Sequence, residues 1–156
     1  MIRIRFGLLT KTAGKNTVPA LIFLLVFLFT FWSNPSLVPK LSPDSLGYWS
    51  IAQNLGVQNE DASIRPWLFP LFIKFCMLIS QENWQTTLSF IQIIFHSLIT
   101  TLLFSLFKNY KLNIIISFIF ALIIGFNPNL QVYTTYVLTD LMLAVLTTLS
   151  WFYILR

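Results

Sequence analysis

Residues 86–107 read TTLSFIQIIFHSLITTLLFSLF, and this stretch decides what kind of fold the chain can have. It contains no Asp, Glu, Lys or Arg, and it ends at the polar turn KNYK, residues 108–111. About 20 apolar residues in an α-helix cross the roughly 30 Å of hydrocarbon in a bilayer. The stretch therefore predicts a membrane-spanning helix.

Three other stretches share this apolar character. The whole chain is 56% hydrophobic and 10% charged, whereas soluble domains are about 45–50% apolar and about 25% charged. We therefore expect a single all-α transmembrane domain, residues 1–156, in a polytopic membrane protein with about four transmembrane helices. The first would be an uncleaved signal anchor, because no small-residue cleavage site follows it. The expected spans are residues 18–34, 86–107, 112–127 and 137–155.

The distribution of basic residues predicts the orientation, because Lys and Arg near span ends favour the cytoplasmic side and acids have little weight. A cytoplasmic N-terminus puts inside Arg3, Arg5, Lys11, Lys15, Lys108, Lys111 and Arg156, and outside Lys40, Arg65 and Lys74. The acids then lie outside or at the outer boundary: Asp44, Glu60, Asp61, Glu82 and Asp140. We expect a multi-pass protein of a bacterial inner membrane or a plasma membrane. The scattered basic residues form no stripe for nucleic acid.

The first external loop, residues 35–85, is too apolar to be fully solvated. Its first part, SPDSLGYWSIAQNLG, carries a helix start, since Ser42 can cap, Pro43 suits the first helical position and Asp44 falls in the first turn. The apolar face of this helix would lie flat at the membrane interface. The second part, RPWLFPLFIKFCMLIS, would begin its helix at Pro66. We expect both helices to be interfacial or re-entrant.

Two acids are candidates for chemistry, and each has a plainer interpretation. Asp44 either stabilises a helix start through the helix dipole, or acts at the outer rim as a general base or a cation ligand. Asp140 lies inside the fourth apolar stretch, where an acid is costly unless it faces a cavity or a partner. The alternative is that Thr139 or Asp140 caps a helix that begins later.

Other polar side chains leave similar alternatives open. Arg65 and Lys74 either hold a phosphate or reach towards lipid headgroups. His96, in the middle of a span, is either functional or hydrogen-bonded to a neighbouring helix. With one histidine and with Cys76 as the single cysteine, the chain can form neither an intramolecular disulfide nor a His/Cys metal cage.

The order of these features resembles a known enzyme family. A signal anchor precedes an external Asp44 with Tyr48 and Ala52. Arg65-Pro66, Pro70, Asn127-Pro128 and a span that opens Leu138-Thr139-Asp140 follow. This pattern is similar to the N-terminal part of the GT-C type polyprenyl-phosphate-sugar glycosyltransferases, such as protein O-mannosyltransferases and lipid A aminoarabinose transferases. We expect the chain to be an N-terminal part of such a larger module.

The resemblance implies transfer of a sugar from a polyprenyl-phosphate carrier to an acceptor at the external face of the membrane. Asp44 and Asp140 would be the catalytic acids, and Arg65, Tyr48 and Lys74 would bind substrate. Asp44 would also be the metal ligand if a divalent cation, Mg²⁺ or Mn²⁺, takes part. Membrane lipid and the sugar donor are the expected partners, with a second membrane chain to complete the module. The alternative is a non-catalytic membrane subunit that docks to a larger partner.

Overall fold

The computed structural model describes residues 7–55, 66–137 and 139–154, with side chains from residue 17 onward. Within these ranges the regular elements are all helical, and one isolated bridge joins Lys40 to Tyr136. The elements are α1 (Gly7–Ser33), α2 (Pro43–Gln53), α4 (Leu68–Ile79), α5 (Trp84–Asn109), α6 (Ile114–Gly125), α7 (Pro128–Val132), the 3₁₀ turn η1 (Tyr133–Thr135) and α8 (Asp140–Ile154).

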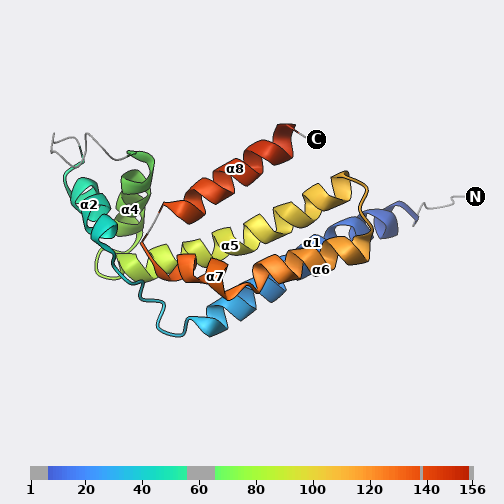
Figure 1. Cartoon of the computed structure of the whole chain (residues 1–156), viewed down its shortest axis with the longest axis horizontal. Coiled ribbons are helices and arrows are strands. Elements are labelled where there is room, and N and C mark those ends of the chain that lie inside the picture. The colour runs from blue at the N-terminus through green and yellow to red at the C-terminus, as the bar shows by residue number, and fades with distance from the viewer. Residues whose placement is uncertain (1–6, 56–65, 138, 155–156) are drawn as a thin grey trace, which may run out of the picture.

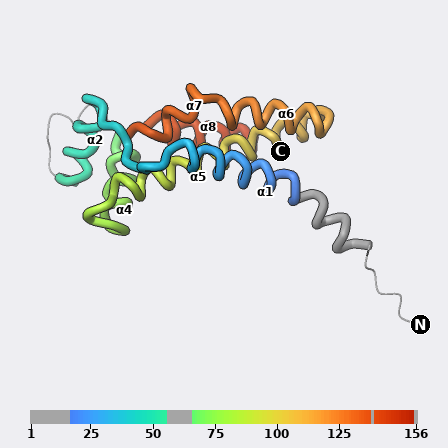
Figure 2. The backbone as a smooth tube through the Cα atoms, turned by 90° about the horizontal axis from the view of Figure 1, so that it is seen from below, coloured from blue at the N-terminus to red at the C-terminus, as the bar shows by residue number. Residues whose placement is uncertain are grey.

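Helix α5 is the centre of the fold (Figure 1). It packs against α1, α6 and α8 along its length and against α4 near its N-terminal end. Helices α1 and α6 lie on one flank of α5, α8 lies on the other, and α2 and α4 form a separate pair beside the start of α5 (Figures 1 and 2). The expectation of an all-α fold is confirmed for the part of the chain that the structure describes.

One described helix, α5, is long and apolar enough to cross a membrane. Helix α6 is too short alone, since its 12 residues span about 18 Å. Together with residues 128–135, from which it is bent by 47°, it passes the same test as a broken span. The apolar part of α1 (Thr17–Ser33), α4 and α8 are shorter. Length and composition thus identify one or two crossings, and the expected number of four stays a prediction.

The break after α6 lies at Asn127 and Pro128, where the expected span 112–127 ends. The Asn127 side chain caps α7 by accepting a hydrogen bond from the Asn129 N–H at 2.9 Å. The Gly125 carbonyl, which would accept from residue 129 in a continuous helix, lies 3.0 Å from His96 Nε2 and accepts from Gln131 Nε2 at 3.3 Å. The interpretation of His96 as a residue bonded to a neighbouring helix is confirmed, and it explains how a broken helix keeps its backbone satisfied.

Gly125 also lets α6 approach α1 closely. A Cβ atom at this position would lie 2.5 Å from Val26 Cγ2, which is closer than side-chain atoms pack. Val26 is completely buried. The absence of a side chain at residue 125 is therefore what permits this crossing.

The start of α2 agrees with the sequence. Ser42 is the N-cap, Pro43 is the first helical residue, and the side chains of Ser42 and Ser45 satisfy each other's backbone N–H groups in a capping box. The apolar face of α2 does not lie open at the surface, as a helix flat on the membrane interface would require. Its residues Tyr48 and Ala52 are buried in a cluster with α4 instead of lying open to the interface.

Two predicted helix starts are wrong. Helix α4 begins at Leu68, so Pro66 precedes the helix. Helix α8 begins at Asp140 and not at residue 137. The preceding backbone pairs with Lys40 instead, since Tyr136 is extended and bridged to Lys40 and the Val137 N–H donates to the Lys40 carbonyl at 3.4 Å.

Candidate functional site

Two distant parts of the chain meet beside the start of α8. The Lys40 N–H donates to the Thr135 carbonyl at 2.6 Å, and the Ser45 hydroxyl donates to the Val137 carbonyl at 2.8 Å. Gln92 on α5 adds a third bond, since its side-chain amide donates to the Tyr136 carbonyl at 3.0 Å. These bonds fasten residues 40–45 to residues 135–137.

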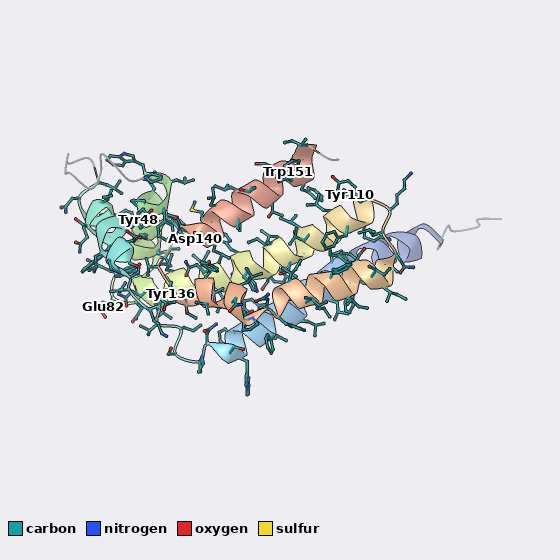
Figure 3. The ribbon with its side chains drawn as sticks, in the orientation of Figure 1. Tyr48, Glu82, Tyr110, Tyr136, Asp140 and Trp151 are labelled. Carbon is teal, nitrogen blue, oxygen red and sulfur yellow. The ribbon has the colours of Figure 1, made fainter. Side chains whose placement is uncertain are left out.

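This junction brings the two candidate acids to one end of the bundle. Asp44 is the neighbour of Ser45, and Asp140 follows Val137 by three residues. Both carboxylates belong to exposed residues in the first turn of their helices. Figure 3 shows Asp140 at this end, near Tyr136 and Tyr48. Acidic side chains in the first turn stabilise a helix through its dipole, so both positions have a structural reason to be acidic.

Asp140 is the first residue of α8 and does not lie in the middle of the helix. The Leu143 N–H bonds to the Thr139 carbonyl at 2.9 Å, so Thr139 stands just before the first turn. This observation supports the interpretation in which the span begins later than its apolar stretch. Asp140 also lines a cavity of about 210 Å³, together with His96 on α5 and Tyr133. The rest of its lining is mainly aliphatic: Ile99, Thr100, Ile124, Leu130, Leu141 and Ala144. An acid at the edge of an apolar cavity is an arrangement that can meet a lipid-linked substrate.

Helix α5 contributes a buried polar stripe that the sequence interpretation overlooked apart from His96. Ser89, Gln92, His96 and Thr100 are all buried, and their spacing puts them on one face of the helix. The signal was present in the sequence, because polar residues recur with helical periodicity in an otherwise apolar span. The Oε1 atom of Gln92 and the hydroxyl of Ser89 have no hydrogen-bond partner in the described part of the chain.

The predicted substrate-binding residues fall in different places. Tyr48 is buried, with its ring 5.3 Å from that of Phe69 in an edge-to-face contact. Lys74 is half buried on α4. Arg65 lies outside the described residues, as do the loop acids Glu60 and Asp61. The structure thus brings Asp44 and Asp140 to one end and places the Tyr48 ring in the packing between α2 and α4.

A metal site would need ligands that the described residues do not supply. Among them, no group of three His, Cys, Asp or Glu side chains lies close enough together to hold a metal ion. A cation at Asp44 would therefore depend on substrate oxygens, on water or on residues outside the described ranges.

Comparisons with protein-family models, curated proteins and solved structures give no match to the chain.

Proposed function

We propose that the chain is a multi-pass membrane glycosyltransferase that moves a sugar from a polyprenyl-phosphate carrier to an acceptor at the external face. The observation that carries the proposal is the Ser45–Val137 hydrogen bond, because it fastens the segment of Asp44 to the segment that precedes Asp140. Two acids from distant parts of the sequence thereby share one end of the bundle.

The membrane placement behind this proposal follows from length, surface and charge. The 26 residues of α5 span about 39 Å, which exceeds the roughly 30 Å of hydrocarbon. Large apolar side chains on the outer faces of α1, α6 and α8 are exposed, among them Leu28, Ile115 and Leu143, as is expected for surfaces that face lipid. The basic Lys108 lies at the end of α5 opposite the acids, so the positive-inside rule puts the acids on the external side.

The proposed reaction needs few groups. Asp44 takes the proton from an acceptor hydroxyl, and the resulting oxygen attacks the anomeric carbon as the bond to the carrier phosphate breaks. The phosphate departs with the bonding electron pair, and the anomeric centre inverts. Asp140 would hold sugar or acceptor hydroxyls by accepting their hydrogen bonds, and the aliphatic cavity beside it would receive apolar parts of the carrier.

The test is transfer from a radiolabelled polyprenyl-phosphate sugar by the purified full chain in lipid nanodiscs. We expect Asp44→Asn to lower the rate by about 10²–10⁴, the usual contribution of a positioned general base. Glu82→Gln is the matched control, because Glu82 is another exposed acid near the same end of the molecule (Figure 3). It should leave the rate unchanged.

The outcomes separate the two candidate functions. Equal transfer by the wild type and by Asp44→Asn would remove Asp44 from the mechanism. No transfer by the wild type, together with copurification of a membrane protein that carries its own external acids, would favour the docking subunit over the enzyme.

A further inference from the structure

A second cavity lies beside the junction, on the α1 side of η1. It occupies about 210 Å³ between the loop that follows α1, Lys40, the first turns of α5 and the residues Thr134 and Thr135. The described acids do not line it. This volume is below the roughly 300–1,000 Å³ of sites that enclose a drug-sized ligand. It therefore suits a small polar group.

Ser89 gives the first sign that a ligand belongs there. Its side chain lines this cavity, the residue is only 3% exposed, and its hydroxyl has no partner among the described residues. Buried polar groups in native proteins nearly always have a hydrogen-bond partner. A ligand in this cavity would give the Ser89 hydroxyl the partner that it lacks.

Leu37 gives the second sign. It lines the same cavity and adopts φ of 50°, a left-handed conformation that strains any residue with a Cβ atom. Its N–H is held by the Asn34 carbonyl at 3.2 Å. Strained backbone that persists in a loop often forms part of a ligand site.

Lys40 supplies the charge. Its backbone is fixed on both sides, since its N–H bonds to Thr135 and its carbonyl accepts from Val137. Its side chain is exposed, and the ammonium lies 5.9 Å from the centre of the Tyr136 ring. Lys40 lines the cavity together with Ser36 and Ser89, and its exposed side chain carries the positive charge.

We propose that this cavity binds a phosphate monoester group, with Lys40 as the cationic partner and the Ser36 and Ser89 hydroxyls as donors. A phosphate monoester carries up to two negative charges and three acceptor oxygens, so it matches one ammonium and two hydroxyls. Thr135 is not a donor here, because its hydroxyl already donates to the Val132 carbonyl at 2.7 Å.

The depth of the cavity indicates a lipid headgroup as the source of the phosphate. Ser89 lies five residues after the start of α5, or about 8 Å along the helix. Since α5 is about 9 Å longer than the hydrocarbon layer, Ser89 lies within a few Å of the headgroup boundary. This inference rests on the membrane placement proposed above but does not require sugar transfer.

The test is binding of short-chain phosphatidic acid to the full chain in detergent, measured by native mass spectrometry, with short-chain phosphatidylcholine as the comparison lipid. We expect phosphatidic acid to bind more tightly. Lys40→Gln should weaken it by about tenfold or more, since the lost bond is charge-assisted. Lys108→Gln, which removes a lysine at the opposite end, is the matched control.

Ser89→Ala is the second variant, and it distinguishes a ligand site from a structural role. It should weaken phosphatidic acid binding while the thermal midpoint stays equal or rises, because it removes a buried hydroxyl that lacks a partner. Competition by inorganic phosphate would show that the site accepts free phosphate, and its absence would show that the attached lipid is required. Equal binding of the two lipids, or equal losses in Lys40→Gln and Lys108→Gln, would overturn the proposal.

Discussion

Gly125→Ala is expected to destabilise the fold by about 1–3 kcal/mol, the usual cost of overpacking a tight contact. The added methyl group would lie 2.5 Å from Val26 Cγ2, 3.2 Å from Val26 Cγ1 and 3.1 Å from Thr100 Cγ2. Val26 cannot turn aside, because a β-branched side chain in a helix has one strongly preferred rotamer. Alanine removes a helix penalty of at most about 1 kcal/mol, and less at the last residue of α6. The clash therefore exceeds the gain.

The same argument predicts that Val26→Ala rescues Gly125→Ala. Alone, Val26→Ala leaves a small cavity, whereas in the double variant the methyl of residue 125 occupies part of the vacated space. We expect a favourable coupling energy of about 1–2 kcal/mol, within the range seen for side chains in contact.

The assay is thermal unfolding of the full chain in detergent, followed with a thiol-reactive dye. Cys76 is the single cysteine of the sequence and is buried, so the dye reports its exposure on unfolding. A Gly125→Ala protein as stable as the wild type would refute the clash. Simply additive effects of the two substitutions would show that the lost stability does not come from the contact with Val26.

Two further predictions concern the junction and the single thiol. Ser45→Ala should lower the free energy of unfolding by about 1–3 kcal/mol, because it leaves the Val137 carbonyl without its 2.8 Å donor and the Ser42 N–H without its 2.9 Å acceptor. The control Ser150→Ala, at an exposed residue, should change the free energy of unfolding by less than about 0.5 kcal/mol. Equal shifts in melting temperature for the two variants would contradict this prediction. Burial raises the pKa of Cys76 from 9.0 to about 11, so alkylation by iodoacetamide at pH 9 should be about tenfold or more slower in the folded than in the denatured chain. The folded rate should keep rising up to pH 11, and a plateau near pH 9 would contradict the shift.

The sequence predicted those helix ends that depend on neighbouring residues alone. The cap at Ser42, the proline at position 43 and the stop at Asn127-Pro128 all depend on residues within one helical turn, and the structure has them where the sequence puts them. The apolar stretch 86–107 likewise lies within α5.

Contacts between distant residues decided the rest. The apolar stretch did not predict the start of α8, because the residues before the helix pair with Lys40: Tyr136 is bridged to it and the Val137 N–H bonds to its carbonyl. The burial of the Tyr48 ring depends on Phe69 in another helix. The role of Gly125 depends on Val26, which the sequence does not connect with it. These pairings require a three-dimensional arrangement that periodicity alone does not specify.

The break after α6 and the late start of α8 together leave residues 136 and 137 outside any helix. The Gly125 carbonyl lies within hydrogen-bond distance of His96, and Asp140 lines a cavity together with His96. His96 is about 18 Å along α5 from Trp84. On that side, the part of α5 that precedes His96 therefore packs against the short turn η1 and not against two full helices. If α5 crosses the bilayer as proposed, the non-helical residues 136 and 137 lie at membrane depth, where such backbone persists only if protein covers it or water reaches it. The hydrogen bonds that Thr135, Tyr136 and Val137 make with Lys40, Gln92 and Ser45 supply that cover.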